Sequence, residues 1–145
     1  MEVEHVASCG KLEKFSEEEI VSFLHVALQE FGDPKEDIRR CLHYATKEIP
    51  SFGGEVIVAS ENGEIAGAVI INNTGMKGYI PEHILVYIAV GKDYRGRGLG
   101  EDLMQKAKEV TTGDIALHVE KDNPAVHLYK KVGYENPYLE MRLKK

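Results

Sequence analysis

The segment that decides the fold lies at residues 83–110 and reads HILVYIAVGKDYRGRGLGEDLMQKAKEV. Its first eight residues, His83–Val90, are a nearly continuous apolar run, which predicts a strand covered on both faces in the middle of a sheet. A turn rich in glycine and arginine follows at residues 91–98. The rest has the period of a helix, with one apolar face made of Leu99, Leu103, Ala107 and Val110. We therefore expect a central strand, a glycine turn and a helix in succession.

The glycines of this turn stand at alternate positions, Gly96, Gly98 and Gly100, at the start of the helix. Glycine lets a backbone approach a ligand closely, and the free N–H groups and dipole of a helix N-terminus favour an anion. Arg95 and Arg97 add positive charge. The turn therefore predicts a phosphate site; an ordinary turn with two solvated arginines is the alternative. The lysine and hydroxyl of a Walker loop and the glycine spacing of a dinucleotide fold are both missing.

Two helices are predicted in the N-terminal third. Ser16 and Glu19 form a capping box, which satisfies two free backbone N–H groups, in front of an amphipathic repeat. Gly32 is expected to end this helix. Asp33 then supplies an N-cap, and Pro34 a preset first turn, for a second helix.

A change of period after residue 50 predicts strands. Residues 55–60 and 64–72 are β-rich runs, and Asn62-Gly63 between them tolerates the positive φ of a tight hairpin. Residues 73–81 form a loop by composition.

Short elements complete the chain after the glycine turn and its helix. We expect a strand at residues 115–119, a helix at residues 124–132 opened by Asn123, and a last strand at residues 138–143. The order β, α, α, β, β, β, α, β, α, β predicts a mixed α/β domain.

Composition limits the classes of function. A chain of 145 residues with 43% hydrophobic content suits a single globular domain, residues 1–145. With 18 Lys and Arg against 24 Asp and Glu, it lacks the basic character of a nucleic-acid binder. No apolar run approaches the roughly 18 residues of a membrane span, and the first ten residues do not resemble a signal peptide. We expect a cytoplasmic protein with no membrane partner, no metal site, and free thiols at Cys9 and Cys41.

Two runs of the sequence belong together: Arg-x-x-Gly-x-Gly at residues 95–100 and Asn-x-Ala-x-x-Leu-Tyr-x-x-x-Gly-Tyr at residues 123–134. In this order they resemble the signature of the GCN5-related N-acetyltransferase (GNAT) superfamily, and the resemblance covers residue 84 to the C-terminus. It implies a mixed, mostly antiparallel central sheet flanked by about four helices. It also implies an N-acetyltransferase that uses acetyl-CoA and an amine acceptor, and it allows a homodimer.

The resemblance implies a set of cofactor-binding residues. The central strand would bind the pantetheine arm of CoA as an added strand would, and the glycine turn would bind the pyrophosphate. The asparagine of the second run would contact the cofactor, cap the next helix, or do both. The implied residues are Ile88, Ala89, Val90, Arg95, Gly96, Arg97, Gly98, Leu99, Gly100 and Asn123.

The resemblance also implies catalytic residues for direct transfer of the acetyl group. Tyr129 would protonate the leaving thiolate, because a phenol can donate a proton at neutral pH; the alternative is a core aromatic residue. His118 would accept the proton of the amine, because an imidazole changes charge near neutral pH. Glu82 and His83 are alternative bases, although Ile84 occupies the position that matches the family's catalytic glutamate.

Other classes of function stay open. A non-catalytic module that binds or senses acyl-CoA has the same fold, because a fold does not guarantee turnover. A nucleotide-binding regulatory domain is a weaker alternative. The acceptor amine is undefined. Many peptide-acetylating members of the superfamily cover the peptide with a longer loop between their final two strands, whereas only Asn136 and Pro137 separate Glu135 from Tyr138 here. Acceptor choice is then expected to depend on the first two helices and the loop at residues 73–82.

Overall fold

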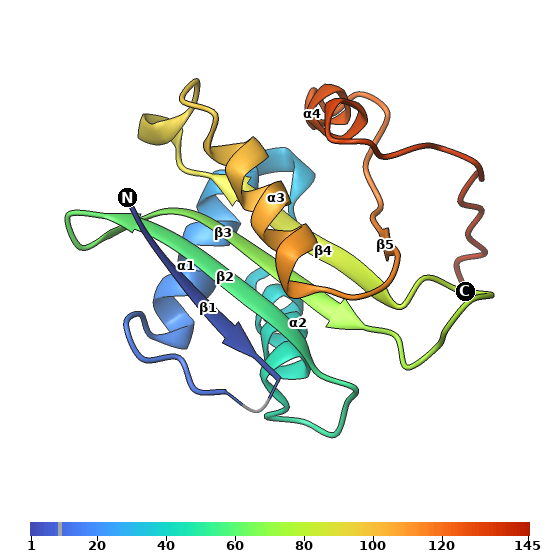
Figure 1. Ribbon diagram of the computed structural model, residues 1–145, viewed down its shortest axis with the longest axis horizontal. Helices are drawn as coiled ribbons and strands as arrows, with labels where there is room; N and C mark the ends of the chain where they lie inside the picture. Colours follow the sequence, from blue (N-terminus) through green and yellow to red (C-terminus); the bar gives the residue numbers. More distant parts are fainter. Residues whose placement is uncertain (9) are drawn as a thin grey trace.

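The computed structural model describes residues 1–8 and 10–145 and has a five-stranded sheet between two pairs of helices (Figure 1). Helices α1 and α2 pack on one face, and α3 and α4 on the other. The elements in chain order are β1 (Glu2–Ala7), α1 (Glu17–Leu28), η1 (Gln29–Phe31), α2 (Lys35–Thr46), β2 (Gly54–Glu61), β3 (Glu64–Asn73), β4 (His83–Val90), η2 (Lys92–Tyr94), α3 (Leu99–Val110), β5 (Ile115–Ala116) and α4 (Ala125–Lys131).

The sheet has the order β1-β2-β3-β4-β5 and is antiparallel except for the β4–β5 pair. This confirms the mixed, mostly antiparallel fold class with four helices. The predicted central position of β4 is wrong, because β3 is the middle strand. Residues of β4 alternate between buried and half-buried. The apolar run at residues 83–90 therefore belongs to a strand that lies next to a very short edge strand.

The β2–β3 hairpin confirms the predicted turn chemistry. Asn62 has φ 53° and Gly63 has φ 81°, the left-handed pair that a two-residue turn between twisted strands requires. The hairpin therefore fixes the register of β2 and β3 next to the turn.

The start of α1 follows the prediction. The N–H of Glu19 donates to Ser16 Oγ at 3.1 Å, and the N–H of Ser16 donates to Glu19 Oε1 at 3.0 Å. The start of α2 does not, because Pro34 holds the N-cap position and no side chain caps the helix. Asp33 instead turns its carboxylate toward β4. The predicted capping role of Asp33 is therefore wrong.

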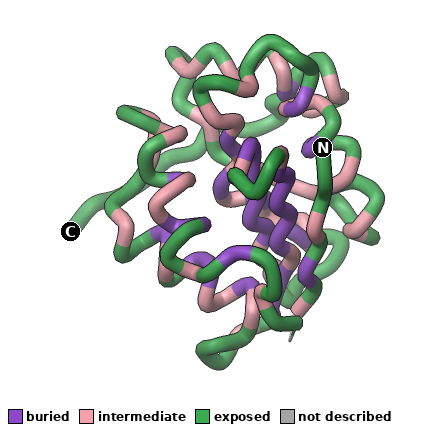
Figure 2. The backbone as a smooth tube through the Cα atoms, turned by 90° about the vertical axis from the view of Figure 1, so that its left-hand side faces the viewer, coloured by how far each residue is buried: buried purple, intermediate pink, exposed green. Residues whose placement is uncertain are grey.

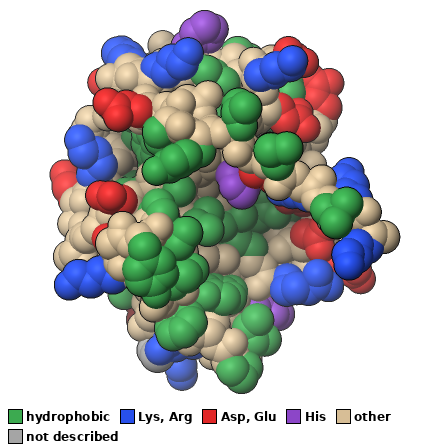
Figure 3. Space-filling model, turned by 90° about the vertical axis from the view of Figure 1, so that its right-hand side faces the viewer, with side chains coloured by type: hydrophobic (Ala, Val, Ile, Leu, Met, Phe, Trp, Pro, Cys, Tyr) green, Lys and Arg blue, Asp and Glu red, His purple; other side chains and the backbone are tan. Residues whose placement is uncertain are grey.

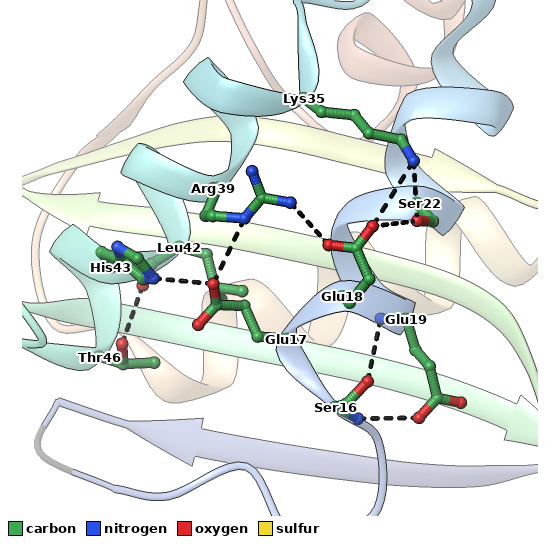
Figure 4. A network of polar contacts seen from close by, with 10 residues as sticks. All are labelled: Ser16, Glu17, Glu18, Glu19, Ser22, Lys35, Arg39, Leu42, His43 and Thr46. Carbon is green, nitrogen blue, oxygen red and sulfur yellow. Dashed lines mark hydrogen bonds and ion pairs between the residues drawn. The ribbon is translucent and has the colours of Figure 1, made fainter.

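Charged side chains join α1 to α2 along their exposed faces (Figure 4). Glu17 pairs with His43 at 2.9 Å and with Arg39 at 3.5 Å, and Glu18 pairs with Arg39 at 2.6 Å and with Lys35 at 3.6 Å. Exposed pairs of this kind each contribute about 0–1 kcal/mol. The apolar contacts beneath them therefore hold the two helices on the sheet.

The buried residues form two clusters, one under each pair of helices, and Figure 2 marks buried residues along the backbone. The cluster under α1 and α2 contains Ile20, Leu24, Ile38 and Leu42. The cluster under α3 and α4 contains Leu103, Met104 and Tyr129. The strands provide the wall between them, because successive side chains of a strand point to opposite faces.

The C-terminal segment corrects two predictions. Residues 138–143 form no strand, and Tyr138, Leu139, Met141 and Leu143 are 83–90% exposed. Strand β5 has two residues instead of the five expected at residues 115–119. The alternation of apolar residues is present in both segments, but a strand also needs a paired edge, and β5 leaves the sheet before it can offer one.

Two further findings concern the whole described chain. None of its helices is long and apolar enough to cross a membrane. Cys41 is a free, buried thiol, and Cys9 lies outside the described residues.

Candidate active site

The edge of β4 is open along most of its length. Among the described residues, only His83 and Ile84 pair with β5, in parallel register with Ile115 and Ala116. Beyond this pair the chain leaves β5 and leads to α4, so that residues 85–90 have no neighbouring strand on that side (Figure 1). An open edge carries unpaired N–H and C=O groups and is a template for an extended ligand.

The backbone of β4 presents alternate residues to this edge. The N–H of Gly91 donates to Ala66 of β3 at 2.7 Å, and residues two apart on an antiparallel strand point the same way. Ala89 therefore directs its backbone groups toward β3, whereas Ile88 and Val90 direct theirs to the open edge. In agreement, the Arg95 side chain reaches the Val90 carbonyl at 3.2 Å.

A bulge marks the middle of the strand. Tyr87 pairs with Ile70 and Leu85 pairs with Ile71, so Val86 is the extra residue. A bulge bends a strand and increases its twist. It lies just beyond the point where β4 and β5 separate.

The glycine turn is unobstructed. Gly96 has φ 76° and Gly98 has φ 80°, and a Cβ added at either position meets no heavy atom within 4 Å. Gly98 is the N-cap of α3, and no side chain caps that helix end. The first N–H groups of α3 therefore face open space, as an anion site requires. Gly100 serves packing instead, since its added Cβ would lie 3.0 Å from Leu128 of α4.

The two arginines of the turn already have partners. Arg95 Nε donates to the Val90 carbonyl, and Arg95 Nη2 donates to the Ala27 carbonyl of α1 at 3.1 Å. Arg97 Nη1 lies 3.4 Å from Glu61 Oε2, and its guanidinium lies over the ring of Tyr94, 5.4 Å from the centroid. In this arrangement the arginines brace the turn, and the groups open to an anion are backbone amides.

Asn123 lies two residues before α4, and Tyr129 lies within that helix. Asn123 Oδ1 accepts a hydrogen bond from the N–H of Ala125 at 2.9 Å, so its side chain satisfies an N-terminal amide of the helix. Tyr129 is 9% exposed in the cluster under α3, and its ring lies 6.0 Å from that of Tyr134. Burial raises the pKa of Tyr129, so the phenol stays protonated near neutral pH.

The three candidate bases differ in their surroundings. His118 is exposed in the segment after β5. Glu82 accepts hydrogen bonds from the N–H groups of Asp114 at 3.1 Å and Gly78 at 3.3 Å, which lower its pKa and weaken it as a base. His83 is 9% exposed, its Nδ1 lies 2.8 Å from Asn73 Oδ1, and its buried Nε2 has no partner among the described residues.

One contact in this region was not foreseen from the sequence. The hydroxyl of Tyr87 donates to Asp33 Oδ2 at 2.5 Å and links the middle of β4 to the connection between α1 and α2. No local signal could indicate it, because the two residues are 54 positions apart.

The surface that holds β5, α4 and the C-terminal segment is hollowed. Figure 3 shows hydrophobic side chains within the hollow and charged side chains around much of its rim. A concave, mostly apolar surface with a few polar groups is typical of a small-molecule site.

Comparison with known proteins identifies relatives of this chain. A family model described as "Acetyltransferase (GNAT) domain" matches residues 52–136. A protein named acetyltransferase from Yersinia pestis (strain Pestoides F) is 31% identical over 113 residues, which are 74% of this chain and 72% of the relative.

Solved structures share the fold at low identity. A ribosomal-protein-alanine N-acetyltransferase from Brucella melitensis biovar Abortus 2308 superposes with a TM-score of 0.64 and 17% identity, over 99% of this chain and 98% of that one. An aminoglycoside antibiotic 6′-N-acetyltransferase from Acinetobacter haemolyticus superposes with a TM-score of 0.66 and 15% identity, over 100% and 98%.

Proposed function

Because this chain belongs to the GNAT acetyltransferase family, we propose that it transfers an acetyl group from acetyl-CoA to a primary amine. The observation that carries this proposal is the continuous path from the open edge of β4 to the unobstructed N-terminus of α3. Acetyl-CoA has an extended arm with a thioester at one end and a pyrophosphate at the other. The arm suits the open edge of β4, and the pyrophosphate suits the N-terminus of α3.

The residues fit acetyl-CoA in two places. Ile88 and Val90 offer backbone groups to the amides of the pantetheine arm, and Ala89 holds the strand against β3. The backbone amides of residues 96–100 face the pyrophosphate, where the open space over Gly96 and Gly98 lets phosphate oxygens approach. Arg95 and Arg97 act as braces that fix the turn. The Asn123 side chain satisfies an N-terminal amide of α4.

The reaction needs a proton donor and a proton acceptor. The amine nitrogen attacks the thioester carbonyl carbon, the C–S bond breaks, and the departing sulfur takes a proton. Tyr129 is the proposed donor, because burial keeps its phenol protonated and the described residues include no hydrogen-bond partner for its hydroxyl. Backbone N–H groups near Val90 are proposed to stabilise the negative charge on the carbonyl oxygen.

His118 is the proposed proton acceptor for the amine. Its exposure, on the segment that borders the open edge of the sheet, leaves it free to act directly or through water. His83 stays an alternative because its Nε2 is unpartnered. Glu82 is a weaker one because two backbone amides already bind its carboxylate.

The primary amine as acceptor is supported by two of the structural neighbours. One is named for acetylating the alanine of a ribosomal protein and the other for acetylating the 6′ nitrogen of an aminoglycoside. Both acceptors are amines, although one belongs to a protein and the other to a small molecule. We propose the shared chemistry and not either substrate.

The test is acetyl transfer by the purified protein. A panel of primary amines is incubated with acetyl-CoA, free thiol is measured, and the acetylated amine is identified by mass. Amine-dependent thiol release supports an enzyme. Tight CoA binding without thiol release on any amine would instead support a module that binds or senses acyl-CoA.

A further inference from the structure

The contact between Tyr87 and Asp33 joins strand β4 to the connection between α1 and α2. Tyr87 follows the bulge residue Val86 and directly precedes Ile88, whose backbone faces the open edge. Its side chain crosses to the α1 and α2 face and donates to Asp33 Oδ2 at 2.5 Å. A carboxylate from the helical connection is therefore held against the strand that carries the reaction.

In this hydrogen bond the Tyr87 hydroxyl donates and the Asp33 carboxylate accepts. Tyr87 is 7% exposed, and burial together with the hydrogen bond to Asp33 raises its pKa, so the phenol stays the donor. Asp33 is exposed, and no Lys, Arg or His of the described chain forms an ion pair with it. His25 Nδ1 contacts only its main-chain oxygen, at 3.3 Å. Two basic residues in the first half of α2 have other partners: Lys35 pairs with Glu18 and Arg40 with Asp37.

A second acceptor, on β3 beneath α2, lacks a donor. Asn72 Nδ2 donates to Sγ of Cys41 on α2 at 3.4 Å. The other atom of that amide, Asn72 Oδ1, is buried without a partner among the described residues. Burying an unsatisfied polar atom is costly. The α1 and α2 side of the sheet thus holds an exposed carboxylate without an ion-pair partner among the described residues and a buried amide oxygen without a donor.

We infer that Asp33, oriented by Tyr87, binds an ammonium group of the acceptor, and that the acceptor is a diamine or another amine with a second positive charge. This inference rests on the proposed acetyl transfer. The nitrogen that attacks the thioester must be neutral, whereas a carboxylate favours a charged partner. One amine cannot meet both demands during attack, but a molecule with two amines can.

The experiment compares straight-chain diamines with monoamines of equal chain length, on the full-length protein. Binding is measured by calorimetry in the presence of CoA, and thiol release is measured with acetyl-CoA. Loss of a hydrogen-bonded ion pair weakens binding by about tenfold or more. We therefore expect at least one diamine to bind about tenfold more tightly than its matched monoamine.

Three variants separate the contributions. Asp33→Asn keeps an oxygen that can accept from Tyr87 but removes the charge, and it should abolish the preference for diamines. Tyr87→Phe keeps the charge but frees the carboxylate, and it should reduce the preference while CoA affinity is unchanged. Glu36→Gln removes an equal charge from the first turn of α2, where Glu36 is exposed, and it should retain the preference.

The outcomes distinguish this inference from the proposed function. Equal binding of every diamine and its monoamine, or a diamine preference that survives in Asp33→Asn, overturns the role of Asp33. If thiol is still released with monoamines in that case, acetyl transfer stands. Diamine binding that depends on Asp33 without any thiol release supports the cation site and contradicts the transferase.

Discussion

The glycine turn allows a substitution whose effect on binding can be separated from its effect on folding. Gly98 at the start of α3 has φ 80°, and Gly63 in the β2–β3 turn has φ 81°. A Cβ added at either position meets no heavy atom within 4 Å. The variants Gly98→Ala and Gly63→Ala therefore introduce the same methyl group at nearly the same positive φ. Only the first places it at the proposed phosphate site.

The stability cost of the two variants should match. A non-glycine residue in the left-handed region costs about 1–2 kcal/mol, and about 1 kcal/mol lowers the Tm of a domain of this size by roughly 4 °C. We expect both variants to melt several degrees below the wild type and within a degree or two of each other, because neither methyl group creates a clash.

The binding cost should fall on Gly98→Ala alone. Its methyl group stands where phosphate oxygens are proposed to approach the amides of α3, and losing one hydrogen bond to a charged group costs about 1.5–3 kcal/mol. CoA affinity should therefore drop by roughly tenfold to a few hundredfold. Calorimetry with CoA and thermal unfolding on the same preparations test both expectations. Full CoA affinity in Gly98→Ala, or an equal loss in Gly63→Ala, would refute the assignment of the turn as the pyrophosphate site.

Three further predictions concern single side chains. Tyr129→Phe keeps the buried ring and removes the phenol, so kcat should fall by about 10²–10⁴ with little change in KM; steady-state kinetics that show an unchanged kcat would return Tyr129 to a packing role. If His118 accepts the amine proton, the rising limb of kcat/KM against pH should stay fixed for two acceptors of different basicity and vanish in His118→Ala, whereas a limb that shifts with the acceptor and survives the substitution excludes His118. Burial raises the pKa of Cys41 to about 12, so at pH 8 a thiol reagent should modify Cys41 far more slowly in the folded protein than in the denatured chain; peptide mapping that finds equal rates would contradict the buried thiol.

Local signals predicted the parts of the fold that depend on neighbouring residues. The capping box at Ser16 and Glu19 and the positive φ values at Asn62 and Gly63 follow from chemistry within a few positions, and both are confirmed. The strand predicted at residues 138–143 failed for the opposite reason. Its alternating pattern is real, but pairing depends on a neighbouring edge whose length is set elsewhere in the chain.

The candidate site shows the same division. The glycines that leave the start of α3 open could be found from their spacing alone. The partners of Arg95 could not, since the Ala27 carbonyl lies 68 residues away in the last turn of α1. Asp33 carries a strong N-cap signal, yet its carboxylate serves Tyr87. A tertiary hydrogen bond at this position replaces the local cap.

The separation of the buried side chains into two clusters affects how such a protein can diversify. No buried residue described belongs to both the cluster under α1 and α2 and the cluster under α3 and α4. Substitutions that reshape the first pair of helices, and with them Asp33, need no compensating change beneath the glycine turn. If Asp33 helps to bind the acceptor amine, acceptor specificity can change through substitutions in the cluster under α1 and α2. The cluster under α3 and α4, next to the proposed acetyl-CoA site, can stay unchanged meanwhile. Laboratory evolution toward a new amine should accordingly accumulate its changes on the α1 and α2 side of the sheet.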